Sequence, residues 1–313
     1  MYLSRKAPLL SICVPTFNEA EKLRETLRSL HFLELLHERE CVEILVSNNA
    51  STDWTANLSG EINLPNMTWF NQEQNLGFKG NMEFLTNRAS GDYVIFLGSG
   101  ELVIANSFPS FVDQLKADSW TLGTVGTKYF DELLGTVSSP DHSSAVAKIA
   151  RKILKPLYIE AISGNVFNRE LLLDALGGES LTGNSWPHVE AALSMASEDN
   201  LRVFAFSNPL VIIHGSSDGW WRQPDQWKLT WEHFVLLARS PLRFKNFFIF
   251  IKYLELSSTS LYAAFSQSAT LNGGPVLVNL AKFRPTKGFN VLVCLTILIL
   301  LISGKISQRG ESP

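Results

Sequence analysis

The chain has 313 residues, of which 45% are hydrophobic and 18% are charged, and its formal net charge is -3. This balance predicts a globular protein of one large or two modest domains and excludes a disordered chain. The absence of a net basic charge argues against a nucleic-acid partner. Three widely separated cysteines, Cys13, Cys41 and Cys294, form no CxxC pair, so we expect no disulfide framework or zinc site and a reducing cytosol as the compartment.

Strand and helix patterns alternate through the first third of the chain. Short apolar runs without alternation predict strands buried on both faces at residues 9–14, 42–47, 67–72 and 92–98. Leucines at three- and four-residue spacing predict a helix over 19–38 with Asn18 as its cap, and a second helix covers 77–89. This order predicts an α/β fold with a wound, mostly parallel sheet that binds ligands beyond the carboxyl ends of its strands.

The middle of the chain predicts a mixture of hairpin, helices and strands. We expect a hairpin over 119–137, a turn and helix over 163–176 capped by Asn168, a helix over 186–196 and strands around 203–214. After Gly219 the chain becomes aromatic, basic and helical in pattern. We therefore predict a domain at 1–220, a helical extension at 221–285, and an apolar C-terminal segment with its tail at 286–313.

The C-terminal segment carries an uncharged and almost wholly apolar run, residues 289–303. As a helix it would span about 22 Å, which is shorter than the roughly 30 Å hydrocarbon core of a bilayer. We expect this run to insert into or lie on a membrane, since so apolar a helix offers water no polar face. The alternative is a buried terminal helix. The N-terminus shows no pattern of a secretory signal peptide.

Polar turns follow the predicted strands. VPTFNEAEKL follows the first strand, VSNNASTD the second, and NLGFKGNMEFL the third, at residues 14–23, 46–53 and 75–85. A helix N-terminus at the carboxyl edge of a sheet suits the polar groups of a nucleotide, and glycines allow close backbone approach. Each motif by itself also fits an ordinary capped turn.

These motifs occur in one order with ASGDYVIFLGSGE, residues 89–101, and together they resemble glycosyltransferase family 2, the inverting transferases of GT-A fold. SGNVFNREL and NSWPHVEAAL resemble the branch that contains abequosyltransferase-type enzymes, and VIIHGSSDGWW resembles the family's late histidine loop. The resemblance covers residues 9–220. It implies a GT-A fold with a C-terminal helical extension.

The resemblance also implies an activity and its partners. Such an enzyme transfers a sugar, with inversion, from a nucleotide diphosphate to a glycan or lipid-linked acceptor in surface polysaccharide synthesis. We expect it in the cytoplasm, at the inner membrane surface. The residues implied to contact the nucleotide are Pro15, Thr16, Asn18, Asn48, Asn49, Gly77, Lys79, Asn81 and Ser99. The family usually has an acid where Asn48 stands, and Lys79 is either a phosphate ligand or a solvated lysine.

The metal motif of the resembled family is degenerate in this chain. Two acids separated by one residue are usual, and the aligned stretch here is GSGE, residues 98–101. Glu101 with His214 could hold Mn²⁺ or Mg²⁺, both of which prefer oxygen ligands. Cationic side chains could instead neutralise the diphosphate, with the candidates Lys79, Arg169 and Arg222. The third alternative is an inactive relative that serves as a membrane-associated binding or scaffold subunit.

The candidate base for the transfer is His188, which aligns with the family's catalytic acid in the branch named above. At a helix N-terminus the dipole disfavours imidazolium, so the ring stays neutral and able to accept a proton. Glu190 is the rival base or the partner that orients His188. The alternative is that His188 packs in the core and Glu190 complements the helix dipole.

Overall fold

The computed structural model describes residues 7–36, 40–131, 136–138, 162–178, 187–195 and 202–215. All of them belong to one unit of the chain, residues 1–217, and a second unit begins at Asp218. The predicted helical extension 221–285 and the apolar segment 286–313 lie outside the described residues, so these domain boundaries stay predictions. Within the described ranges, no helix is long and apolar enough to cross a membrane.

One mixed sheet forms the centre of the described unit, with the strand order β3-β2-β1-β4-β8-β6-β9-β5 and β7 paired to β6. Its strands are β1 (Leu10–Thr16), β2 (Val42–Asn48), β3 (Met67–Asn71), β4 (Tyr93–Phe96), β5 (Leu102–Val103), β6 (Leu122–Asp131), β7 (Thr136–Ser138), β8 (Asn165–Asn168) and β9 (Val203–Gly215). The first four strands are parallel to one another. This half of the sheet confirms the predicted fold class.

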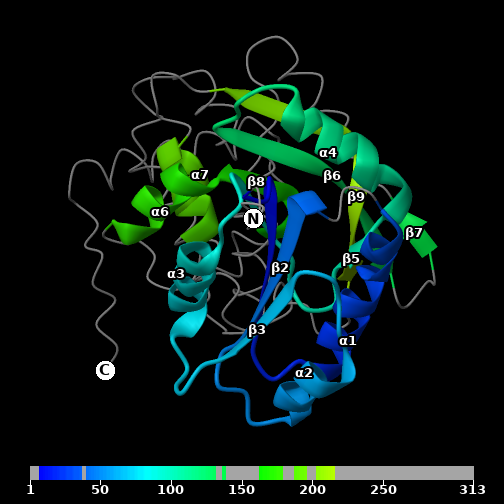
Figure 1. Ribbon diagram of the computed structural model, residues 1–313, viewed down its shortest axis with the longest axis vertical. Coiled ribbons are helices and arrows are strands. Elements are labelled where there is room, and N and C mark those ends of the chain that lie inside the picture. The colour runs from blue at the N-terminus through cyan, green and yellow to red at the C-terminus, as the bar shows by residue number, and fades with distance from the viewer. Residues whose placement is uncertain are drawn as a thin grey trace, which may run out of the picture. The chain divides into compact units, whose positions relative to one another are not determined.

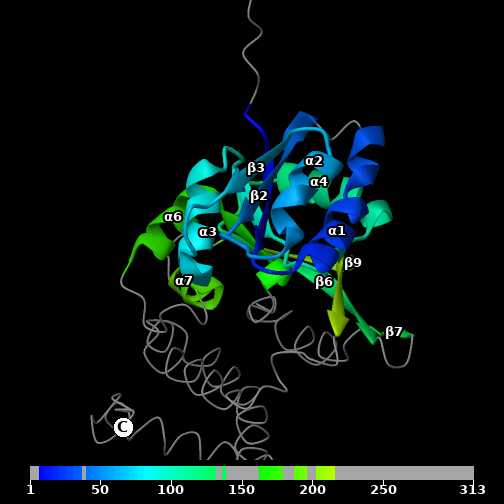
Figure 2. The ribbon, with the colours of Figure 1, turned by 90° about the horizontal axis from the view of Figure 1, so that it is seen from below.

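Helices cover both faces of this sheet. The α-helices are α1 (Ala20–Ser29), α2 (Leu58–Glu61), α3 (Gly77–Arg88), α4 (Phe108–Lys116), α6 (Arg169–Gly177) and α7 (Pro187–Met195). Short 3₁₀ turns are η1 (His31–Leu35), η3 (Trp54–Asn57), η4 (Ala105–Ser107) and η5 (Ile162–Gly164). Figures 1 and 2 show α3, α6 and α7 together on one side of the sheet and α1, α2 and α4 on the other.

The period of two along β1 divides the core between these layers. Ile12 and Val14 belong to the apolar cluster that also contains the buried face of α1 and of α4. Cys13, between them, is fully buried, and this burial raises the pKa of its thiol well above the ordinary value. A strand buried on both faces explains why the sequence shows a continuous apolar run there.

The second half of the sheet is mixed rather than parallel. β4 pairs antiparallel with β8, and β8 pairs antiparallel with β6. The predicted hairpin is confirmed by the antiparallel pairing of β6 with β7, and the predicted cap by Asn168, whose Oδ1 accepts the Leu171 N–H of α6. The two strands expected around 203–214 form a single strand, β9, whose pairing with β6 shifts register near Gly126.

The cap predicted for α1 is wrong. Asn18 lies outside the helix with φ of 54°, and Glu19 occupies the cap position without a side-chain hydrogen bond. The Oδ2 atom of Asp53, from the loop after β2, accepts the Ala20 N–H instead, at 3.1 Å. The regular helix ends at Ser29, earlier than predicted, and η1 continues it.

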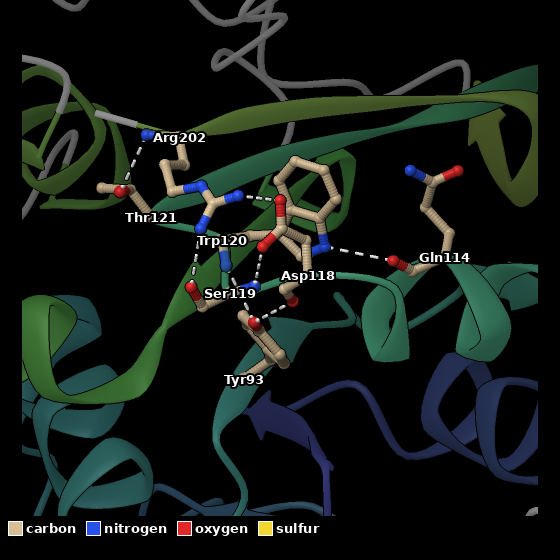
Figure 3. Close-up of polar contacts among 7 residues, drawn as sticks. All are labelled: Tyr93, Gln114, Asp118, Ser119, Trp120, Thr121 and Arg202. Carbon is tan, nitrogen blue, oxygen red and sulfur yellow. Dashed lines mark hydrogen bonds and ion pairs between the residues drawn. The ribbon is translucent and has the colours of Figure 1, made fainter. Parts of the chain in front are cut away.

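A polar cluster joins α4 and the amino ends of β4, β6 and β9 (Figure 3). The Tyr93 hydroxyl donates to the Asp118 carbonyl and accepts the Trp120 N–H at 2.9 Å. The Arg202 guanidinium pairs with the Asp118 carboxylate, and its backbone N–H donates to the Thr121 hydroxyl. This cluster fixes the edge of the sheet opposite to the one where the predicted ligand loops lie.

Gly123 of β6 is required by packing. A Cβ added there would overlap the ring of Phe204, which is buried on β9. We therefore expect Gly123→Ala to reduce the free energy of unfolding by about 1–3 kcal/mol, the usual range for overpacking a core. Urea denaturation measures this. The matched control is Gly60→Ala in α2, where an added methyl meets nothing within 4 Å, and equal stability of the two variants would contradict the packing account.

Candidate active site

The parallel strands β3, β2, β1 and β4 end at one edge of the sheet, and the loops that follow them carry most of the predicted ligand residues. In wound sheets this carboxyl edge is where ligands bind. The bonds among these loops determine what they can present to a ligand.

The loops after β1 and β2 are hydrogen-bonded to each other. The Asn18 N–H donates to the Ser51 hydroxyl at 2.9 Å, and Asn18 Oδ1 accepts the Thr52 N–H at 2.8 Å. Burial tends to raise the pKa of Asp53, but its hydrogen bonds with Thr55 and Ala20 outweigh this and lower it. Because Asp53 also caps α1 from the β2 loop, several hydrogen bonds join the two loops into one unit.

Two asparagines at the end of β2 are buried. Asn48 is 3% exposed, and its Oδ1 accepts the Ser51 N–H while its Nδ2 donates to Asn71 Oδ1. Asn49 Oδ1 accepts the Leu76 N–H at 2.8 Å, and its Nδ2 donates to the Gly77 carbonyl. Both predicted ligand residues therefore bond within the protein and hold the β2 loop against the loop before α3.

Asn81 of α3 bonds to β2 one residue before Asn48. It is 2% exposed, accepts the Ser47 hydroxyl hydrogen at Oδ1 over 2.6 Å, and donates from Nδ2 to the Ser47 carbonyl. These bonds dock α3 onto the end of β2. Gly77, the first residue of α3, has φ of +72°, a conformation that glycine adopts without steric cost.

The loops after β1 and β4 also meet. The Ser99 hydroxyl donates to the Thr16 hydroxyl at 3.0 Å, and Thr16 is buried. Pro15 lies one residue earlier in β1, opposite Ser47. The structure thus gathers Pro15, Thr16 and Ser99 with the β2 loop, as the sequence predicts.

Lys79 points to a different part of the structure. Its ammonium pairs with Glu83 at 2.6 Å and donates to the Leu176 carbonyl at 2.7 Å. Leu176 lies in the last turn of α6, where backbone carbonyls lack helical partners and a lysine is favourable. In this arrangement the charge of Lys79 serves the end of α6, and a role toward phosphate stays a prediction.

Glu101 folds back onto its own loop. Its Oε2 accepts the Gly98 N–H at 2.6 Å. Burial raises the pKa of the Glu101 carboxyl, and the nearby Ser163 hydroxyl and Gly98 N–H oppose that rise. The oxygen ligands that this loop could offer a cation are one carboxylate, which turns inward, and the hydroxyls of Ser99 and Thr16. This set does not fit a cation site built on two acids. Among the described residues, no group of three metal-ligating side chains occurs.

The remaining predicted metal and charge candidates are less fully described. His214 lies in β9, where its backbone pairs with Phe130, and its side chain lies outside what the structure describes. Arg169 is the first residue of α6 and is half-buried, while Arg222 lies outside the described residues.

His188 lies in the first turn of α7 and is 4% exposed. Its ring packs edge-on against Phe78 of α3, with 6.1 Å between ring centroids. Phe78 follows Gly77, so the candidate base is next to the helix that carries the predicted ligand residues Gly77 and Asn81. Glu190 is half-buried on the same turn. The structure therefore places His188 beside the first turn of α3, although the two helices are far apart in the sequence.

Two residues at this edge, Phe17 and Asn71, are not among the predicted site residues. Phe17 directly follows β1 and is 42% exposed, although it is a large apolar side chain between polar ones. An exposed aromatic ring in a ligand loop can stack on a heterocycle, and PTFN at a strand end is the signal that could have identified it. Asn71, at the end of β3, is the hydrogen-bond partner of Asn48.

A parallel half-sheet extended by a mixed half, with hydrogen-bonded polar loops at its carboxyl edge, is the arrangement of a GT-A fold. The family description that matches, Glycosyl transferase family 2, covers residues 11–171, just over half of the chain. The chain therefore belongs to glycosyl transferase family 2 and is a glycosyltransferase, as the motifs predict.

Individual relatives agree with this assignment. The chain is 26% identical over 229 residues to abequosyltransferase RfbV of Salmonella typhimurium, covering 67% of this chain and 68% of that protein. S. aureus TarS 1-349 in complex with UDP-GlcNAc has a TM-score of 0.59 and 17% identity, covering 93% and 80% of the two chains.

A third relative has the same fold. The mannosyltransferase PcManGT from Pyrobaculum calidifontis, solved with GDP-Man and Mn²⁺, has a TM-score of 0.61 and 19% identity, covering 95% and 87% of the two chains. At these identities, the two solved structures support the GT-A fold of this chain and no finer property.

Glu101 should affect stability in a pH-dependent way. A carboxyl whose folded-state pKa is raised contributes stability below its ordinary pKa of 4.5 and loses that contribution as the pH rises through the folded value. Glu101→Gln keeps an oxygen for the Gly98 N–H and cannot ionise. Its melting temperature should match the wild type near about pH 4 and exceed it by a few degrees near about pH 8.

The same pair of proteins tests whether Glu101 is a metal ligand. A ligand that binds only the folded state raises the melting temperature. If Glu101 is structural, Mn²⁺ shifts the melting temperatures of the wild type and of Glu101→Gln equally. Stabilisation by Mn²⁺ of the wild type alone would contradict this assignment.

Proposed function

We propose that this glycosyltransferase moves a sugar, with inversion, from a nucleotide diphosphate to a glycan or lipid-linked acceptor. The observation that supports this most is that the polar loops at the carboxyl edge of β1, β2, β3 and β4 are hydrogen-bonded to one another. Such a preformed rim suits a ligand with many polar groups. The names of the relatives supply the substrate class, since TarS was solved with UDP-GlcNAc and PcManGT with GDP-Man.

In this proposal the nucleotide lies along the loops after β1 and β2. Pro15 and Thr16 form one side, and Phe17 offers its exposed ring. The Ser51 hydroxyl accepts the Asn18 N–H and keeps its own hydrogen to donate to the ribose. The positive-φ residue Gly77 allows the backbone before α3 to approach the ligand closely. Asn49 and Asn81 support this surface from below.

The transfer itself needs one base. His188 takes the proton of the acceptor hydroxyl while that oxygen attacks the anomeric carbon from the side opposite the leaving group. The new bond to the acceptor forms, the bond to the nucleotide diphosphate breaks, and the configuration at the carbon inverts. The position of His188 in the first turn of α7 favours its neutral form, which is the form that can accept the proton.

No step of this proposal passes through a metal. PcManGT was solved with Mn²⁺, so a divalent cation is known in one protein of this fold. In this chain the described residues of the β4 loop do not provide the two-acid site that would hold one, because Glu101 is the one acid of that loop and bonds to the Gly98 N–H.

We also propose that the enzyme works in surface polysaccharide synthesis at the cytosolic face of a membrane. The resemblance to abequosyltransferase RfbV supports the first part. The apolar run 289–303 and the basic, aromatic run 242–254 in the sequence support the second, because such segments favour an anionic membrane surface.

Donor turnover tests this proposal. Purified protein is screened by thermal shift against nucleotide sugars that differ in base and sugar, and hydrolysis of any stabilising donor is then measured with Mn²⁺ and with EDTA. We expect one donor to stabilise the protein and to be turned over. Neither binding nor turnover under either condition would favour the alternative, a membrane-associated scaffold subunit.

His188→Ala should separate chemistry from binding. Removing a general base costs about 10²–10⁴-fold in rate, whereas the donor contacts lie on other loops. We expect kcat to fall by that factor while the Kd for the donor stays within about twofold of wild type. Glu190→Gln is the comparison, and it should lower kcat less if Glu190 only orients the histidine. Normal turnover by His188→Ala would show that the base assignment is wrong.

A further inference from the structure

A cavity of about 750 Å³ opens at the end of β3, the edge strand of the sheet. Its lining residues are Trp69, Phe70, Asn71, Gln72, Glu73, Gln74, Leu76 and Phe84. Trp69 and Asn71 point to one face of β3 and bond to each other, whereas Phe70 points to the other face and packs against Phe84 of α3. Its size is within the usual range for small-molecule sites. The described lining residues include one acid, Glu73, and no lysine or arginine, so this surface suits a neutral heterocycle better than a diphosphate.

The orientation of the Asn48 amide next to this cavity is fixed by chemistry. The backbone N–H of Ser51 can only donate, so the atom of Asn48 that it contacts at 3.0 Å is Oδ1. The other end of the amide, Nδ2, therefore faces Asn71 at 2.9 Å. Because Asn48 is buried and bonded at both ends, it does not line the cavity.

The orientation of Asn71 follows in the same way. The indole N–H of Trp69 is a donor without acceptor capacity, and it lies 3.1 Å from Asn71 Oδ1. Two donors, from Asn48 and Trp69, thus meet at this one oxygen. The group that Asn71 can offer to the cavity it lines is its NH₂, and Asn71 is exposed there.

We propose that Asn71 reads the base of the nucleotide donor by donating a hydrogen bond from Nδ2, and that Asn48 is a positioning residue that holds Asn71 in this orientation. This inference rests on the proposed function and names a specificity residue within it. We call the hydrogen bonds that join Ser51, Asn48 and Asn71 the amide relay. An acid at position 48 would turn an acceptor oxygen, instead of an NH₂ donor, toward Asn71 Oδ1, so the amide relay requires an amide at that position.

Asn71→Asp is the decisive variant. A carboxylate at 71 still accepts from Asn48 and Trp69, so the amide relay is kept, but its second oxygen presents an acceptor to the cavity in place of a donor. The affinities of UDP, dTDP, CDP, GDP and ADP are measured by calorimetry for the full-length wild type and variant, with pyrophosphate as the base-free probe. Asn63→Asp is the control, because it adds the same charge at an exposed position outside the cavity.

The expected result depends on the base. The nucleotide that binds best to the wild type should lose about tenfold or more in Asn71→Asp, the usual effect of an unmatched polar pair, and the rank order of the five should change. Pyrophosphate binding should stay unchanged, and Asn63→Asp should behave as wild type. Asn48→Asp should weaken the same nucleotides as Asn71→Asp, by a smaller factor, and should leave the affinity for pyrophosphate unchanged. A merely structural role of Asn48 would not produce this dependence on the base.

Three outcomes would overturn the inference. If Asn71→Asp keeps the affinities and their order, or loses affinity equally for all five nucleotides, Asn71 does not read the base. If Asn48→Asp leaves the order unchanged, Asn48 does not position Asn71. A wild type that binds none of the five nucleotides contradicts the proposed function itself, and this result is distinguishable from the first two because it needs no variant.

Discussion

Side-chain amides at the carboxyl edge of the sheet hold the loops after β1, β2 and β3 in one arrangement, and the rest of the site depends on them. Buried amides must satisfy both a donor and an acceptor end. Asn48 and Asn49 do so by bonding to neighbouring loops rather than to solvent, while the exposed Asn18 accepts the Thr52 N–H at its Oδ1. The rim is therefore formed before any ligand arrives, so binding does not have to order these loops.

α3 connects this rim to the candidate base. Its first turn begins at Gly77, which Asn49 contacts, and Asn81 fixes the helix to β2. Phe78 of the same helix packs against His188 of α7, and Lys79 holds the end of α6. One helix thus contacts both the loop after β2 and the candidate base. The cluster around Tyr93 and Arg202 links the strands at the opposite edge of the sheet (Figure 3).

The sequence predicted the parts of the fold that local patterns determine. Apolar runs located β1 to β4, and the Asn168 cap was found because a cap and its helix are adjacent in sequence. The Asp53 cap of α1 was missed because its carboxylate comes from a loop more than thirty residues away. The antiparallel pairing of β8 with β4 and β6 was not predicted, since β8 has only four residues and carries little pattern.

The same distinction applies to the site. Sequence placed Thr16, Asn48 and Ser99 in ligand loops, and the structure brings these loops together. It could not tell which amides face a ligand and which face the protein, because that depends on partners such as Trp69 and Ser51. Nor could it predict that Glu101 turns inward onto Gly98, which depends on the conformation of a four-residue turn.

The central claim is that the tied loops form one nucleotide site. Amide hydrogen exchange, followed by mass spectrometry with and without the nucleoside diphosphate that binds best, tests it most directly. The account predicts added protection together in residues 16–20, 47–53 and 71–78. Protection confined to other segments of the chain, with these three unchanged, would contradict it.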